Sequence, residues 1–172
     1  MDFAARTNIP VITTLMGIGA YPSGAPQSLG MPGMHGTVTA NRAITNSDLI
    51  LGVGLRFDDR VTGKVSRFAP NATIVHIDID PAEISKLVKA HVPVVGDVRD
   101  VLPRLGELLD RLEVDEWWAT LNEWKTKYPE RYSKDKPLVS QEVLEIFRTA
   151  TNGDCVVTTE VGQHQMFAAR LF

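Results

Sequence analysis

The chain has 172 residues, enough for one domain with a hydrophobic core and part of a second. Its net charge is only −3, and both signs are mixed along the chain, which gives no indication of nucleic-acid or polyanion binding. No apolar run approaches the roughly 20 residues that cross a bilayer, and the N-terminus lacks a secretory-signal pattern. The single cysteine, Cys155, lies in an apolar run, so a buried, inert thiol in a reducing compartment is expected.

Short apolar runs rich in Val, Ile and Leu recur along the first hundred residues. Such near-continuous runs are typical of strands that are covered on both faces, as in parallel sheets. The sequence therefore predicts strands over residues 9–15, 48–54, 73–79 and 92–96.

Helical patterns lie between and after these strands. Asp80 and Pro81 are suited to begin a helix, and Glu83 completes a spacing like that of a capping box. Apolar residues at helical spacing predict another helix over 98–112, which Pro103 could interrupt. Alternation of strands and helices predicts an α/β fold with a doubly wound parallel sheet.

The pattern changes after residue 112. Trp117, Leu121, Trp124 and Tyr128 are spaced by four, three and four residues, which predicts a helix with one apolar stripe that packs on the sheet domain or a neighbour. The polar segment 128–137 has the composition of a linker.

A second unit is predicted to begin after this segment. It comprises a helix capped by Ser140, a turn at Asn152-Gly153 and a strand over 155–159. One helix and one strand cannot bury a core, so we expect this unit to be incomplete. The predicted division is 1–112 for an α/β domain whose N-terminal edge is missing, 113–137 for a helical linker and 138–172 for the start of a second domain.

Glycines and acidic residues follow several predicted strands. Gly52 and Gly54 end one strand, Asp78 ends the next, and Gly96-Asp97 follows the fourth. Ligands of open α/β sheets bind at this carboxyl edge, where an acid often accepts hydrogen bonds from a ribose. A tight turn without a ligand explains the two glycines equally well on their own. Glycines and acid together favour a nucleotide site, while Asp80 serves as a helix cap.

Two polar loops could complete that site. Gly33-Met34-His35-Gly36-Thr37 precedes a predicted helix and could lie against a flat ring or meet a phosphate, although a flexible surface loop has the same composition. Arg56-Phe57-Asp58-Asp59-Arg60 follows the second strand, where an arginine could bind phosphate or carboxylate. Solvated surface charge is the alternative for this second loop.

A third candidate segment lies near the C-terminus. Thr158 to Gln165 resembles a phosphate-binding strand–glycine–helix arrangement in outline, with His164 as a possible donor. A polar surface histidine is the simpler alternative. The four histidines of the chain do not have metal-ligand spacing, and the sequence predicts no metal site.

Together these segments resemble the catalytic subunit of the acetolactate synthase (acetohydroxyacid synthase) family of thiamine-diphosphate enzymes. They occur in family order and cover most of the chain, with Pro32 and Glu160 as departures from the usual leucine and aspartate. The matching stretches are 13–17, 33–37, 56–64, 75–84 and 161–166.

The resemblance implies three cofactors: FAD, thiamine diphosphate and Mg²⁺, with the FAD doing no net redox work. It assigns residues 1–112 to a central FAD-binding domain and 138–172 to the start of the diphosphate-binding domain. It implies that Asp59 and Arg60 lie at the substrate entrance, with Arg60 engaging the 2-oxo acid. It implies FAD contacts for Thr14, Leu15, Gly33, Met34, His35, Gly54, Arg56, Asp58, Asp78, Ile79, Asp97 and Val98, and thiamine diphosphate contacts for Gly162, Gln163 and His164.

The reaction implied is condensation of two pyruvates to 2-acetolactate and CO₂, or of pyruvate with 2-oxobutyrate to 2-aceto-2-hydroxybutyrate, in branched-chain amino-acid biosynthesis. The family's activating glutamate and its Gly-Asp-Gly magnesium motif are absent from the 172 residues, so this chain alone is expected to be inactive. Implied partners are the 2-oxo acids, further copies in a homodimer or homotetramer, and a small regulatory subunit, with no nucleic acid or membrane. The implied location is the cytoplasm, or a plastid or mitochondrion after removal of a transit peptide.

Two other classes stay open. One is a different flavin-containing thiamine enzyme, such as glyoxylate carboligase or pyruvate oxidase, which the 56–64 stretch disfavours. The other is a stand-alone nucleotide-binding module of the transhydrogenase type, which the linker and second unit disfavour.

Overall fold

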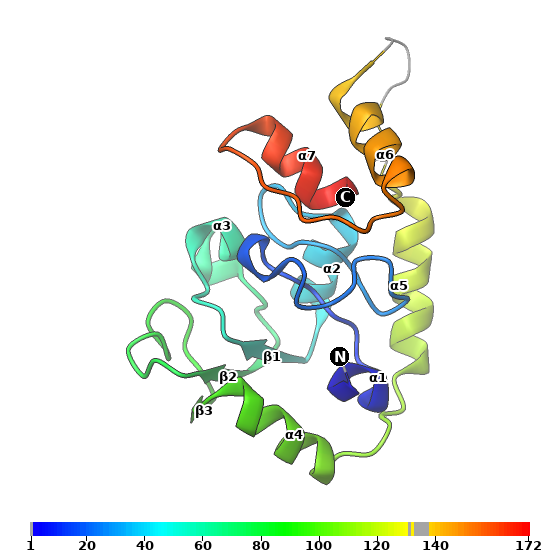
Figure 1. The fold of residues 1–172 in the computed structure, drawn as a ribbon. Helices are drawn as coiled ribbons and strands as arrows, with labels where there is room; N and C mark the ends of the chain where they lie inside the picture. The colour runs from blue at the N-terminus through cyan, green and yellow to red at the C-terminus, as the bar shows by residue number, and fades with distance from the viewer. Residues whose placement is uncertain (1, 131, 133–137) are drawn as a thin grey trace.

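The computed structural model describes residues 2–130, 132 and 138–172, and Figure 1 shows its α/β architecture. No helix in this described part is long and apolar enough to cross a membrane. Most of the predicted linker, residues 131 and 133–137, lies outside the described residues. The elements in chain order are α1 (Asp2–Thr7), η1 (Leu15–Gly17), α2 (Val38–Asn46), β1 (Leu49–Val53), α3 (Asp59–Thr62), η2 (Val65–Arg67), β2 (Thr73–Asp78), β3 (Val92–Val95), α4 (Val98–Leu108), α5 (Asp115–Lys127), α6 (Ser140–Ala150) and α7 (Gln163–Leu171).

Three of the four predicted strands form a parallel sheet in the order β1-β2-β3. Their register pairs Val53 with Ile77 and Asp78 with Val95, so the carboxyl ends of all three strands meet at one edge. In Figure 1, α2 and α4 lie on opposite sides of this sheet, which confirms the predicted α/β class.

The predicted strand over 9–15 is wrong. The segment is extended, but it forms only one isolated parallel bridge, between Val11 and Ser28, and its end turns into η1. Beyond this bridge the Thr13 N–H donates to the carbonyl of Gly30, 3.1 Å away, and not to that of Leu29 as a regular parallel ladder would require. Thr14 then caps η1 by accepting from the Gly17 N–H, 3.2 Å away, so the ladder does not continue.

The predicted helix beginning at Asp80 is also wrong. Asp80 does accept a hydrogen bond from the N–H of Ala82, 2.9 Å away, as a capping residue would. The residues that follow form turns, and Ser85 has a positive φ of 61° that a right-handed helix does not allow. A local capping interaction is therefore present without a helix.

Helix α5 packs into the sheet domain. Leu121 is fully buried in a cluster with Leu29, Ala40 and Ala43, against which Trp117, Trp118 and Trp124 also pack. The Trp118 indole N–H donates to the carbonyl of Asn8, 2.8 Å away. The apolar stripe predicted from the sequence thus covers α2 and the N-terminal loops, along the side of the molecule seen in Figure 1.

The C-terminal segment forms two helices that pack on each other, with the rings of Phe147 and Phe172 5.8 Å apart. The predicted strand over 155–159 is wrong: the segment forms no ladder with any described residue, and a strand requires a partner for its backbone groups. The prediction of a buried Cys155 is wrong for the same reason, because the unpaired segment leaves its thiol exposed.

Candidate functional site

The carboxyl edge of the sheet brings together three of the predicted ligand residues. The Gly54 N–H donates to the carbonyl of Ile77, 2.8 Å away, and the Gly96 N–H donates to the carbonyl of Asp78, 2.9 Å away. Gly54, Asp78 and Gly96-Asp97 therefore lie on adjacent strand ends, as the sequence predicted.

This edge offers room for a ligand. Gly54 has a φ of 60°, and a Cβ atom built there would meet nothing within 4 Å. Along the same edge, after β2 and after β3, Ile79 is 68% exposed and Val98 is 38% exposed, although both are apolar. An open backbone beside exposed apolar side chains fits the approach of a large, partly flat cofactor such as FAD.

The two acids of the edge differ in their surroundings. Asp78 is buried, and its Oδ1 accepts from the N–H of Asp80, 2.9 Å away. Asp97 begins α4 and accepts from the backbone N–H of Arg99, while the Arg99 guanidinium lies 2.6 Å from its Oδ2. Hydrogen bonds from the Arg99 side chain and backbone lower the pKa of Asp97 to about 2.

The polar loop after β1 lies beside this edge. Asp58 accepts from the N–H groups of Arg60 and Val61 and thereby begins α3, while its Oδ2 lies 3.7 Å from Arg56. The next pair, Asp59 and Arg60, is separated by 3.8 Å and is mostly exposed. All four charges remain accessible to a ligand or substrate.

The glycine loop before α2 is held in place by two neighbours, the helix α2 itself and the polar loop after β1. The Asn41 side chain accepts from the Gly33 N–H and donates to the Gly33 carbonyl, at 2.8 and 2.9 Å. The Met34 N–H points to the Arg60 carbonyl, 3.3 Å away, while the side chains of Met34 and His35 stay exposed. The loop therefore presents a free face beside Arg60.

The segment with Thr14 and Leu15 lies next to the same loop, because the Thr13 N–H donates to the Gly30 carbonyl, 3.1 Å away. Both residues are half-buried. The sequence did not reveal the Asn41 clamp; its one signal was the place of Asn41, four residues after the helix cap Thr37.

Gly162, Gln163 and His164 lie at the start of α7, and the last two have exposed side chains. Within the described residues, no hydrogen bond or ion pair joins these three to the residues for which the resemblance implies FAD contacts. The other end of α7 does reach the N-terminal loops, where it closes a cavity of about 200 Å³.

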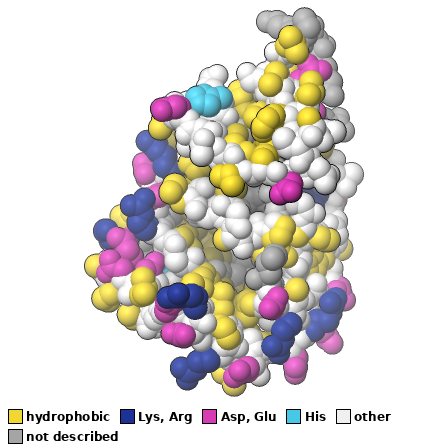
Figure 2. Space-filling model, viewed as in Figure 1, with side chains coloured by type: hydrophobic (Ala, Val, Ile, Leu, Met, Phe, Trp, Pro, Cys, Tyr) yellow, Lys and Arg dark blue, Asp and Glu magenta, His cyan; other side chains and the backbone are white. Residues whose placement is uncertain are grey.

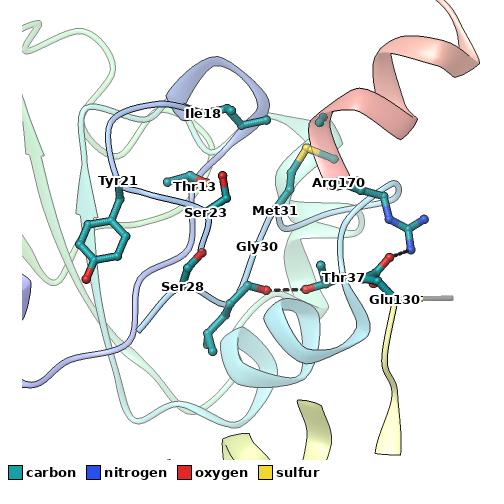
Figure 3. Close-up of a pocket in the computed structure, with 12 residues that line it drawn as sticks. Thr13, Ile18, Tyr21, Ser23, Ser28, Gly30, Met31, Thr37, Glu130 and Arg170 are labelled. Carbon is teal, nitrogen blue, oxygen red and sulfur yellow. Dashed lines mark hydrogen bonds and ion pairs between the residues drawn. The ribbon is translucent and has the colours of Figure 1, made fainter. Parts of the chain in front are cut away.

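Figure 3 shows this cavity, which the sequence did not predict. Thr13, Ser23 and Ser28 line one side, and Arg170 lies across from them in an ion pair with Glu130. On the face shown in Figure 2, charged side chains gather over the half of the molecule that contains the sheet, and hydrophobic ones gather over the C-terminal segment.

Fold and edge together define an α/β domain with a three-stranded parallel sheet and an open carboxyl edge, and comparison with known proteins identifies the family. The family model described as the central domain of thiamine pyrophosphate enzymes matches residues 1–105. The chain therefore belongs to the thiamine pyrophosphate enzyme family, through its central domain.

The chain is similar to curated proteins that carry the name acetolactate synthase. The large subunit of Haemophilus influenzae is 46% identical over 98% of this chain and 31% of its own length. The isozyme 3 large subunit of Escherichia coli is 47% identical over 94% of this chain and 30% of its own length. The acetolactate synthase of Mycobacterium bovis is 48% identical over 98% of this chain and 29% of its own length. The chain is thus homologous to acetolactate synthase large subunits and spans less than a third of their length.

Proposed function

We propose that this chain is the FAD-binding part of an acetolactate synthase that condenses two pyruvates, or pyruvate and 2-oxobutyrate. One observation supports this most directly: the register of β1, β2 and β3 brings Gly54, Asp78 and Asp97 to one open edge. The homology to acetolactate synthases over nearly the whole chain supports this activity over those of other thiamine enzymes.

In the proposed complex, the chain's own residues hold FAD from several sides. Gly54 lets the backbone approach it closely, and Asp78 accepts hydrogen bonds from its ribose. Arg56, which lies 3.7 Å from Asp58 and is 69% exposed, would face its phosphates. The exposed side chains of Met34 and His35 would pack against its ring. Contacts are also proposed for Thr14, Leu15, Gly33, Asp58, Ile79, Asp97 and Val98.

Thiamine diphosphate, held with Mg²⁺, would supply the electron sink of the reaction. Gly162, Gln163 and His164 would contact its diphosphate, because the free N–H groups at the start of α7 suit an anion. Arg60 would bind the carboxylate of the incoming 2-oxo acid, and Asp59, 3.8 Å away, would hold its guanidinium in place. We also propose a cytoplasmic location, assembly with further copies and association with a small regulatory subunit.

A chimaera tests the proposal. This chain would replace the aligned residues of the Escherichia coli isozyme 3 large subunit, and acetolactate formation from pyruvate would be measured. We expect the chimaera to form acetolactate, and its Arg60→Ala variant to have a raised KM for pyruvate with FAD still bound. A chimaera that folds and binds FAD but forms no acetolactate would contradict the proposal.

The unaltered 172-residue chain provides a second test. Supplied with pyruvate, Mg²⁺, FAD and thiamine diphosphate, it should form no acetolactate, because the Gly-Asp-Gly motif that the family uses for magnesium does not occur in it. Product formation would show that the catalytic groups have been assigned to the wrong residues.

A further inference from the structure

The polar loop between β1 and α3 is held from beneath by a buried histidine that none of the proposed ligand contacts includes. His76, in the middle of β2, is 0% exposed. Its Nε2 lies 2.9 Å from the carbonyl oxygen of Leu55, in the loop itself. A carbonyl can only accept a hydrogen bond, so Nε2 must carry the proton and donate it.

The same imidazole also fixes the next aromatic residue of the loop. The Phe57 ring packs edge-on against His76, with centroids 4.9 Å apart, and is 2% exposed. Phe57 has a positive φ of 50°, which is unfavourable for an aromatic residue and requires support from its surroundings. The loop is therefore held at Leu55 through a hydrogen bond and at Phe57 through ring packing.

The register of the sheet explains why Phe57 fits there. Gly52 is the partner of His76 across β1 and β2. A Cβ atom on Gly52 would lie 2.6 Å from the Cζ atom of Phe57, so any larger residue would displace the ring. The glycine of β1 thus makes room for the loop to fold back over the sheet beside His76.

These contacts determine where the two charged residues on either side of Phe57 lie. With Leu55 and Phe57 held inward, Arg56 must point outward, where it is 69% exposed. Asp58 is brought to the start of α3, where it caps the helix and lies near Arg56. The position of both charges depends on the contacts of His76 with their neighbours.

We infer that His76 is a positioning residue that sets the loop carrying Arg56 and Asp58 for an anionic, phosphate-bearing ligand. This inference rests on the proposed function, in which that ligand is FAD. The Nδ1 atom of His76 is buried and has no hydrogen-bond partner among the described residues, so the Leu55 carbonyl is its one polar anchor there.

Two variants separate the hydrogen bond from the packing. His76→Phe keeps a planar ring but removes the donor, while His76→Gln keeps an N–H near the position of Nε2. His91→Phe is the matched control, because the His91 ring also bonds the backbone of β2, at the Ile74 N–H, but outside the loop. Each chain would be titrated with FAD, and hydrogen exchange of residues 54–58 would be measured without ligand.

We expect His76→Phe to raise the Kd for FAD by roughly five- to tenfold, in line with the loss of one net hydrogen bond, and to speed exchange in the loop. His76→Gln should restore most of the affinity, and His91→Phe should leave it unchanged. In the unaltered chain, the His76 Nε2–H should give an NMR resonance protected from exchange with solvent, a result that does not depend on any variant folding.

Unchanged loop exchange and FAD affinity in a folded His76→Phe chain would overturn the inference, as would a His76 ring proton that exchanges freely. Equal losses in the folded Phe and Gln variants would also overturn it, because the donor would then not matter. Failure of the unaltered chain to bind FAD would instead overturn the proposed function, and with it the ligand role of His76. Loop exchange would still report separately on the structural contact.

Discussion

Gly33 and Arg60 are packed so closely that a Cβ atom on residue 33 would lie 1.8 Å from the carbonyl oxygen of Arg60. The contact joins the glycine loop before α2 to the turn that begins α3. These two segments lie far apart in the sequence, and no local pattern indicates that they touch. Gly33 also has a φ of 90°, so its conformation and its surroundings both exclude a side chain. The proposed flavin face and the proposed substrate arginine are thereby fixed relative to each other.

Gly33→Ala should separate these two loops. We expect the free energy of unfolding to fall by about 2 kcal/mol, from backbone strain and steric overlap, and FAD affinity to fall at least tenfold. Urea unfolding and flavin fluorescence titration would measure the two effects. Gly24→Ala is the matched control, because a Cβ there would meet only the Arg148 side chain, at 3.9 Å. Equal behaviour of both variants would show that the contact does not matter.

Asp58 has two roles that substitutions can separate. Asp58→Ala removes the cap of α3 and the charge facing Arg56, and should cost about 1 kcal/mol of stability as well as FAD affinity. Asp58→Asn keeps a capping side chain, so it should retain stability while still weakening FAD binding. Thermal unfolding together with FAD titration distinguishes the roles; an Asn variant that binds FAD as tightly as the unaltered chain would argue against a role for the charge.

The lowered pKa of Asp97 predicts that the stability of the folded chain depends on pH in the acid range. Its pKa is lowered from 3.8 to about 2 in the folded chain, so its contribution to stability is present above 3.8 and is lost as the pH falls towards 2. Arg99→Gln removes the largest cause, and the pKa of Asp97 should then rise towards 3.8. NMR titration of the Asp97 carboxyl group would measure this. An unchanged pKa in the variant would show that Arg99 does not engage the carboxylate in solution.

Helix α5 should be required for the stability of the sheet domain. Leu121 is 0% exposed in the cluster with Ala40, so Leu121→Ala should cost about 2–5 kcal/mol. Leu108→Ala, on an 82% exposed side chain, should change stability by less than about 0.5 kcal/mol. Urea unfolding compares the two. Similar midpoints would mean that α5 does not pack on the domain in solution.

The sequence predicted the sheet edge well, because apolar strands followed by glycine or aspartate are local signals. Gly54, Asp78 and Asp97 could be placed at that edge because the ends of parallel strands coincide. Long-range contacts were not accessible from such signals. Residues 9–15 have the composition of a strand, but only the bridge to Ser28 forms, and the capping pattern at Asp80 ends in turns once Ser85 adopts a positive φ.

The wrong prediction for Cys155 and the contacts that were missed also arise because long-range packing cannot be read from local patterns. Cys155 was expected to be buried because its neighbours are apolar, yet burial requires a partner surface, and Val156 beside it is 94% exposed. The Asn41 clamp on Gly33 and the His76 contact with Leu55 join residues that only the fold brings together. Composition and spacing cannot show such pairs.

FAD binding at the edge formed by Gly54, Asp78 and Asp97 is the step on which every proposed role of these residues depends. Titration of the 172-residue chain with FAD, followed by quenching of flavin fluorescence, tests it most directly, with NAD titrated in parallel. We predict saturable binding of one FAD per chain, weakened by Gly33→Ala and by His76→Phe, and no comparable binding of NAD. Saturable NAD binding without FAD binding, or no binding of either, would contradict the account.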